Sequence, residues 1–184
     1  MHAVDVTLEN LAESPSEVLS SVFWELDREE LPVDPGFLKE EWFSSTLLEW
    51  GPCGKLLIDG GVVGFTQYGP PSLFPRLARF RCGEVSPDAV YLSYCYMVPK
   101  RRGRGEGSQL IRTVARDLVD RGFRALEAIG DREWEGDWVL PAGFLASSGF
   151  AVIREDPRFP LMRLSLGSRQ EPAVQATAVQ LPEG

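Results

Sequence analysis

The feature of this sequence that most constrains its fold is an apolar strand, a glycine-rich loop, an amphipathic helix and a second strand in direct succession. Residues 89–98 are apolar and aromatic without alternation, which is typical of a strand covered on both faces. Apolar side chains recur at helical spacing over 108–121, Gly122 would end that helix, and residues 123–129 return as a strand. Two strands joined through a helix of this length pair in parallel. The sequence therefore predicts an α/β domain with a parallel strand pair at its centre.

The loop between that strand and that helix, residues 99–108, has the composition of a phosphate-binding site. Its glycines let the backbone turn tightly and let a ligand approach the amide groups. The helix start adds unpaired N–H donors and a partial positive charge, and four basic side chains surround it. Neither nucleotide motif fits, because no lysine follows Gly107 and the glycines are spaced GxGxG rather than GxGxxG. The alternative, a basic and flexible surface turn, is disfavoured by the strand before the loop and the helix after it.

Charge is unevenly distributed along the chain, whose formal net charge is −8. Residues 1–60 hold 13 acidic and 3 basic side chains, whereas residues 76–124 hold 11 basic and 5 acidic ones. An acidic total argues against nucleic-acid binding. The basic middle instead predicts one local site for an anion.

Histidine and cysteine are too scarce for several kinds of chemistry. The single histidine, His2, lies at a chain end, which argues against Ser-His-Asp and Cys-His catalytic arrangements. Cys53, Cys82 and Cys95 show no CxxC spacing, so we expect small buried side chains in a reducing cytoplasm, with no metal site and no disulfide framework. Residues 1–10 lack the features of a signal peptide, and the longest nearly apolar run has ten residues. We therefore expect a cytoplasmic protein without membrane contact.

The remaining segments predict an ordinary succession of short elements. We expect a first strand at 3–8, a helix begun by a capping box from Ser14 to Glu17, a helix from Asp34-Pro35 to Gly51, a hairpin over 55–68 turning at Asp59-Gly60-Gly61, a loop over 70–88, a helix over 142–148, and an antiparallel pair at 150–154 and 161–166. Residues 1–166 would then form one domain. Residues 167–184 are short of bulky apolar side chains and are expected to be a disordered tail.

Three segments of the chain resemble the GNAT N-acetyltransferases. The run Arg102-Gly103-Arg104-Gly105-Glu106-Gly107 matches the family's Arg/Gln-x-x-Gly-x-Gly/Ala signature, and residues 95–99 look like the strand that leads into it. Residues 144–150 are similar to the family's Phe-Tyr-x-x-x-Gly-Phe segment. The resemblance covers roughly residues 3–166. It implies the GNAT acyltransferase fold, an α+β mixed sheet that is mostly antiparallel, carries helices on both faces, and contains a central parallel strand pair splayed to admit acetyl-CoA.

The resemblance also implies where acetyl-CoA would bind. In this family the pyrophosphate lies on the loop amides, and the pantetheine pairs like a strand with the backbone of the preceding strand. The residues so implicated are Cys95, Tyr96, Met97, Arg102, Gly103, Arg104, Gly105, Glu106, Gly107 and Ser108. Lys100, Arg101 and Arg104 are candidates for the 3′-phosphate, or are simply solvated. No metal is implied.

Family chemistry is direct transfer of acetyl from the thioester to an acceptor amine. Many members use a glutamate on the fifth strand as the general base, and Glu127 matches that position. The alternative is that Glu127 faces solvent or pairs with an arginine such as Arg124. Leu145 stands where the usual tyrosine acid would be, so the candidates for the acid are water, Tyr94, Tyr96 and Ser147.

The acceptor itself is not identified by the sequence, but two features bear on it. The acidic side chains of residues 1–60 would suit a cationic amine, or form a solvated face. Trp134, Trp138 and Pro141 would shape an acceptor pocket, or pack as core or lid. The expected function is an acetyl-CoA-dependent N-acetyltransferase for a small cationic amine or a peptide amine. The alternatives are a catalytically silent acyl-CoA-binding module and a different nucleotide-binding protein. Because dimers are common in the family, a homodimer is a further expectation.

Overall fold

The computed structural model describes residues 1–27, 33–136 and 138–167, so the predicted tail lies almost wholly outside the described residues. The strands within that part of the chain are β1 (His2–Asp5), β2 (Gly54–Ile58), β3 (Val62–Gly69), β4 (Ala89–Met97), β5 (Ala125–Asp131), β6 (Leu140–Pro141), β7 (Ala151–Arg154) and β8 (Leu161–Ser165). The α-helices are α1 (Ser16–Leu19), α2 (Pro35–Glu49), α3 (Glu106–Asp120) and α4 (Ala142–Ser147). Short 3₁₀ turns occupy Leu11–Glu13, Pro71–Leu73, Pro75–Arg79 and Pro99–Arg101.

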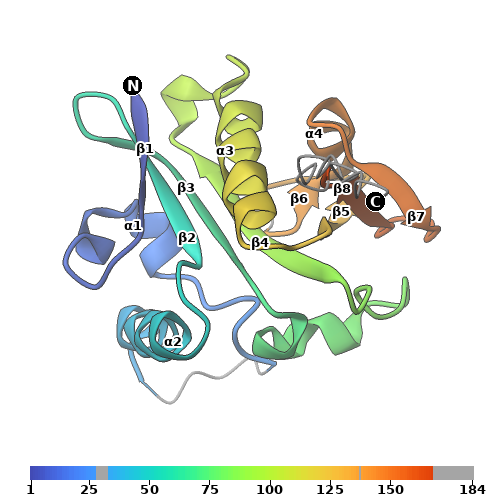
Figure 1. The fold of residues 1–184 in the computed structure, drawn as a ribbon, viewed down its shortest axis with the longest axis horizontal. Helices are drawn as coiled ribbons and strands as arrows, with labels where there is room; N and C mark the ends of the chain where they lie inside the picture. The colour runs from blue at the N-terminus through green and yellow to red at the C-terminus, as the bar shows by residue number, and fades with distance from the viewer. Residues whose placement is uncertain (28–32, 137, 168–184) are drawn as a thin grey trace, which may run out of the picture.

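The strands form one mixed sheet in the order β1-β2-β3-β4-β5-β8-β7, with β6 paired to β5 (Figure 1). Neighbouring strands are antiparallel except for the parallel pairs β4–β5 and β5–β6. The predicted fold class, a largely antiparallel mixed sheet with a central parallel pair, is confirmed. The two-residue strand β6 is an addition that the sequence did not reveal.

Helices cover both faces of the sheet, and β4 contributes to the core on each side. On one face, Tyr91 and Tyr94 pack in the same cluster as Val18 of α1 and Phe43 of α2. On the other face, Leu92 packs with side chains of α3 and α4. Figure 1 shows α3 lying across β3 and β4, with α4 beside the β5 half of the sheet. A strand apolar on both faces is therefore what this central position requires.

Two predicted local signals are confirmed and explain where elements begin. The Asp34 side chain accepts hydrogen bonds from the backbone N–H of Gly36 and of Phe37 and so caps α2. The β2–β3 hairpin turns at Asp59-Gly60-Gly61, where Gly60 has φ 70° and Gly61 has φ 152°.

The predicted capping box at Ser14 does not form. Helix α1 is a single turn, Pro15 occupies its N-cap position, and the Ser14 hydroxyl is buried without a hydrogen-bond partner. The expected helix stops early because Trp24 is buried against Tyr91. A helix continued from α1 would direct Trp24 well away from the face that carries Val18. Burial of this large side chain therefore decides the path of the chain after α1.

The parallel strands β4 and β5 pair only over their first residues. The register pairs are Ala89–Ala125, Val90–Leu126 and Tyr91–Glu127. Beyond them β4 follows β3, β5 follows β8, and β6 attaches to the far end of β5. Ser93 forms a β-bulge in β4, since Tyr94 pairs with Gln67 while Leu92 pairs with Tyr68. The sheet therefore opens between β4 and β5.

Candidate active site

A cavity of about 660 Å³ lies where β4 and β5 separate. Its lining includes Cys95 and Phe144 from the core beneath α3 and α4, and Tyr94 and Trp138 from the core on the α1 and α2 side. The cavity therefore passes through the opening in the sheet. We call the part beside the loop before α3 the α3 end, and the part lined by Glu17, Tyr94, Tyr96 and Trp138 the α1 end.

The three glycines of the loop at the α3 end differ in backbone conformation and in the space around them. Gly103 and Gly105 have φ values of 74° and 77°, a backbone conformation that side chains with a Cβ rarely adopt. A Cβ at Gly107 would lie 3.1 Å from the Phe144 ring, so a side chain here would require that ring to shift by a few tenths of an ångström. Within the described part of the chain, no atom beyond the glycine and its two neighbours in sequence lies within 4 Å of a Cβ built at Gly103 or Gly105. The first turn of α3 therefore presents its amides to open space, as an anion site requires.

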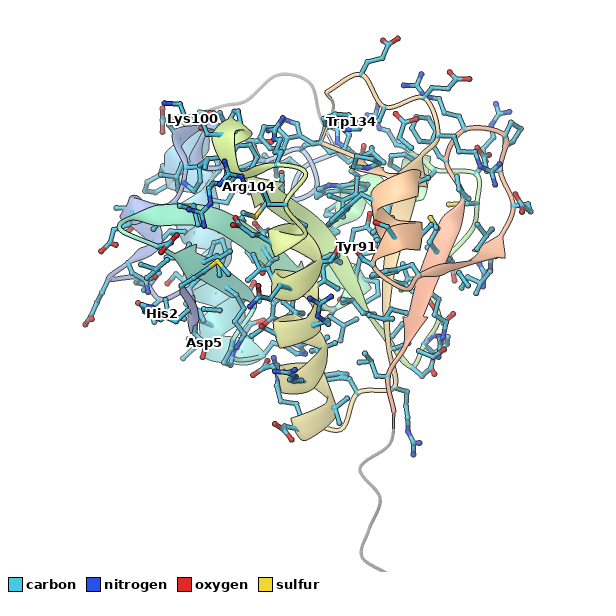
Figure 2. All side chains as sticks on the ribbon, turned by 90° about the horizontal axis from the view of Figure 1, so that it is seen from above. His2, Asp5, Tyr91, Lys100, Arg104 and Trp134 are labelled. Carbon is cyan, nitrogen blue, oxygen red and sulfur yellow. The ribbon has the colours of Figure 1, made fainter. Side chains whose placement is uncertain are left out.

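The four basic side chains of the loop differ in exposure and in bonding partners. Lys100 and Arg104 are exposed and lie on the loop at the N-terminal end of α3, with Trp134 at the same end of the molecule (Figure 2). Arg101 is engaged by two carboxylates, with N–O distances of 2.7 Å to Asp59 and 2.8 Å to Glu106. The Nε of Arg102 donates to the Met97 carbonyl oxygen at 3.0 Å and so ties the loop to the end of β4.

Nearly all of the predicted cofactor residues are brought together. The exception is Arg104, which does not line the cavity; the residues that do are Cys95, Tyr96, Met97, Arg102, Gly103, Gly105, Glu106, Gly107 and Ser108. The Ser108 hydroxyl lies 2.8 Å from the Ser148 hydroxyl, a bond that joins α3 to the end of α4. Burial raises the pKa of the Cys95 thiol to about 12, which keeps it neutral.

The structure does not bring Glu127 to the cavity. Its side chain is fully buried and is absent from the cavity lining. One carboxylate oxygen lies 2.8 Å from Nη1 of Arg163, and the other accepts the backbone N–H of Ser86 at 2.9 Å. Arg163 also pairs with Asp88 at 2.7 Å. Glu127 therefore pairs with an arginine, as the alternative interpretation allowed, but with Arg163 rather than Arg124.

The three candidate acids all line the cavity, and each hydroxyl already has an acceptor within the protein. Tyr94 donates to Glu25 at 3.1 Å, and Tyr96 donates to Glu17 at 2.9 Å. Ser147 donates to the backbone carbonyl of Phe144 within α4 at 2.8 Å. Burial and the nearby Glu25 carboxylate raise the pKa of Tyr94 well above its usual value. Leu145 is fully buried in the core, so its position supplies no group to the cavity.

A buried polar cluster behind Tyr94 was missed by sequence reasoning. The ammonium of Lys39 on α2 pairs with Glu25, and Gln67 on β3 donates to Glu25 at 2.8 Å. The Lys39 nitrogen also lies 4.2 Å from the centre of the Tyr94 ring. The signal in the sequence was that Lys39 lies at helical spacing from Phe43 and Thr46, the other two residues that α2 buries. Burial lowers the pKa of Lys39, and the charged partner Glu25 opposes that shift.

The tryptophan-rich loop after β5 contributes to the cavity and to the core. Trp134, Trp138 and Pro141 all line the cavity. Trp138 also packs edge to face against Tyr94, with ring centres 5.4 Å apart, and its carbonyl accepts a hydrogen bond from the indole of Trp24. Trp138 therefore packs in the core and also lines the cavity.

The described residues contain neither a candidate metal cluster nor a candidate membrane span. No group of three or more histidine, cysteine, aspartate or glutamate side chains is arranged to hold a metal ion in the part of the chain that the structure describes. Over the same residues, no helix is long and apolar enough to cross a membrane.

Comparison with known proteins gives a family match and structural neighbours. Residues 17–134 match the model of the acetyltransferase (GNAT) family. No curated protein sequence matches the chain.

Three solved structures illustrate the shared fold. The Salmonella typhimurium protein yncA, solved with its cofactor acetyl-CoA, is 17% identical with a TM-score of 0.58, covering 95% of this chain and 98% of its own. The ribosomal-protein-alanine N-acetyltransferase of Brucella melitensis is 20% identical with a TM-score of 0.55, covering 89% and 97%. The PaiA N-acetyltransferase of Thermoplasma acidophilum, in complex with coenzyme A, is 12% identical with a TM-score of 0.54, covering 89% and 98%.

Proposed function

Because the chain belongs to the GNAT acetyltransferase family, we propose that it is an N-acetyltransferase that transfers the acetyl group of acetyl-CoA directly to an acceptor amine. The observation that carries this proposal is the cavity through the splayed sheet, whose two ends differ in chemistry. One end offers backbone amides and basic side chains, which suit phosphates. The other offers aromatic rings and a carboxylate, which suit an amine.

The α3 end fits the phosphates of coenzyme A. The open space over Gly103 and Gly105 leaves the first amides of α3 accessible to a pyrophosphate. Lys100 and Arg104 are exposed on the loop before α3 and are proposed to meet the 3′-phosphate, whereas Arg101 is held by Asp59 and Glu106. Residues 1–166 are proposed to form the whole transferase domain.

The exposed edge of β4 fits a pantetheine chain. Beyond Tyr91, none of the described strands pairs with β4 on the side where β5 departs. Because Val98 and, by the register, Tyr96 bond to β3, the backbone groups of Cys95 and the N–H of Met97 face this open side, where an extended amide-containing chain would supply their partners. Bound in this way, acetyl-CoA would supply the activated acetyl thioester between the two ends of the cavity.

The chemistry that this chain supports is a single direct transfer. An acetyl-cysteine intermediate is disfavoured because the Cys95 thiol, with its pKa raised to about 12, is almost entirely protonated at neutral pH. The thioester carbonyl must be polarised and the leaving thiolate protonated. We propose that these demands are met inside the passage, out of reach of Glu127.

The hydrogen-bond partners rank the candidate acids. Turning the Tyr94 hydroxyl toward the cavity would remove a bond from the buried carboxylate of Glu25, a loss of about 2 kcal/mol. Tyr96 and Ser147 have more accessible partners, so less is lost when their hydroxyls turn. We therefore propose Tyr96 or Ser147 as the acid and a structural role for Tyr94.

The test is an acceptor screen. Purified protein is incubated with acetyl-CoA and a broad amine panel, free thiol is measured, and the product is identified by mass spectrometry. Transfer supports the proposal when thiol release depends on the amine and matches acetylated product in amount. Absence of acetylated product across the panel would contradict it.

A silent acyl-CoA-binding module is the second candidate, favoured by Leu145 in place of the usual tyrosine and by the engaged hydroxyls around the cavity. Tight binding of acetyl-CoA in calorimetry, without turnover, would identify it. A thermal shift caused by ATP or NAD but not by coenzyme A would instead indicate another nucleotide-binding protein.

A further inference from the structure

We propose that Glu17 binds a second positive charge on the acceptor, so that the preferred substrates are diamines or amines that carry a guanidinium group. This inference rests on the proposed function and names the substrate class of the same cavity. Glu17 lies on α1 and lines the α1 end, where an acceptor would approach.

The charge inventory of the cavity singles out Glu17. Among the residues that the structure describes, Glu17 and Glu106 are the carboxylates in the lining. Glu106 is neutralised by Arg101, whose Nε and Nη2 lie 2.9 and 2.8 Å from its two oxygens. Glu17 has no ion pair within 4 Å among the described residues. The cation that acts on it at longer range is Arg102, which also lines the cavity.

The Glu17 carboxylate is held in place by neutral hydroxyls. Its two oxygens accept hydrogen bonds from Tyr96 at 2.9 Å and from Ser16 at 3.2 Å. Hydrogen bonds from its own backbone N–H and from Tyr96 lower the pKa of Glu17 below its usual value. The nearby cation is Arg102, whose guanidinium lies 5.4 Å from the centre of the Tyr96 ring. Glu17 is thus ionised and oriented at neutral pH and remains open to a further cationic partner.

Three aromatic rings line the same end of the cavity as this carboxylate. Tyr96 and Trp138 have ring centres 6.5 Å apart with planes inclined at 39°, and Tyr94 packs against the same tryptophan with ring centres 5.4 Å apart. The electron-rich face of a tyrosine or tryptophan attracts an ammonium or guanidinium group. A carboxylate beside such faces favours a cation over a neutral or anionic group. The amine to be acetylated would then reach deeper into the passage.

The experiment compares wild type with Glu17→Gln on matched substrates. The probes are 1,5-diaminopentane and pentylamine, which differ by one ammonium group. The expected wild-type preference in kcat/KM is about tenfold for the diamine, and Glu17→Gln should reduce it to less than about twofold. The acetyl-CoA Kd should stay within about twofold of wild type, and the loss in kcat/KM should be several-fold larger for the diamine than for pentylamine.

Glu13→Gln is the matched control, because Glu13 is an exposed acid just before α1 that does not line the cavity. It should retain the diamine preference. A loss of preference in Glu13→Gln equal to that in Glu17→Gln would show a bulk charge effect and overturn the proposal. Equal wild-type rates on the two amines, or an equal loss on both in Glu17→Gln, would overturn it as well.

Failure of this proposal can be told apart from failure of the proposed function. If no amine is acetylated, calorimetry of 1,5-diaminopentane binding to the coenzyme A complex still tests whether Glu17 binds a cation. Binding that is weakened about tenfold by Glu17→Gln would keep the cation site in a protein that is not a transferase. Absence of diamine binding, or binding indifferent to Glu17→Gln, would overturn it.

Discussion

The two ends of the cavity are built in opposite ways. The α3 end comes from one continuous segment, residues 99–108, and its main donors are backbone amides made accessible by glycines. The α1 end is assembled from side chains distant in the sequence; Glu17 and Tyr96, which share a hydrogen bond, are 79 positions apart. A backbone site depends on chain geometry and tolerates side-chain change, whereas a side-chain site can be altered one residue at a time. The first arrangement suits a constant co-substrate, and the second suits a variable acceptor.

The strongest way to break this comparison is to block the α3 end alone. Gly105→Trp places a large side chain in the open space over the loop. We expect acetyl-CoA affinity to fall at least about 100-fold, equivalent to about 2.7 kcal/mol, because the anion site becomes covered. Calorimetric titration measures the effect.

Gly60→Trp is the matched control, since Gly60 also has positive φ and open space around a Cβ but lies on the β2–β3 turn. It separates the backbone strain of such a substitution from the loss of the site. Unchanged acetyl-CoA affinity in Gly105→Trp, or an equal loss in Gly60→Trp, would contradict the assignment of the loop.

A variant at Glu127 tests whether this buried carboxylate takes part in the reaction at the α1 end. Glu127→Gln leaves the buried side of Arg163 without its charged partner, so we expect the free energy of unfolding to fall by about 2 kcal/mol. Denaturant unfolding measures that loss. The pH profile of kcat, per folded enzyme, should be unchanged because Glu127 does not line the cavity.

The exposed residue Glu133 provides a control, and Glu133→Gln should change neither quantity. A pH profile that loses its decline of kcat at low pH in Glu127→Gln, with kcat also reduced at neutral pH, would instead support Glu127 as the general base that the family resemblance implies.

The smallest expected effect concerns Cys95, which lies between the two ends. With its pKa raised to about 12, only about one molecule in 10⁴ carries a thiolate at pH 8. Cys95 should therefore be alkylated by iodoacetamide far more slowly in the folded protein than in urea, as followed by mass spectrometry. Cys95→Ala should keep kcat within about twofold, and its complete inactivation would indicate an acetyl-cysteine intermediate.

The features that could be predicted from the sequence are those built from one continuous segment, like the α3 end of the cavity. Features that depend on contacts between distant segments, like the α1 end, could not be predicted. The strand, loop and helix over residues 89–121 lie together in the chain, so periodicity was enough to predict these elements, and the glycine spacing indicated the loop for which an anion site is proposed. The partner of Glu127 could not be predicted, because Arg163 is brought beside it only by the pairing of β5 with β8. The early end of α1 was missed because burial of Trp24, a tertiary contact, outweighs the local helical pattern.

The opening between β4 and β5 also divides the sheet mechanically. Strands β1 to β4 and strands β5, β8 and β7 are joined by three register pairs, whereas β3–β4 and β5–β8 share six and five. One apolar cluster spans this seam, so amide hydrogen exchange should report a partial opening between these two units before either unfolds. A ligand bound along the seam would contact both units at once and join them, so the rate of this opening should be lowest while the co-substrate is bound.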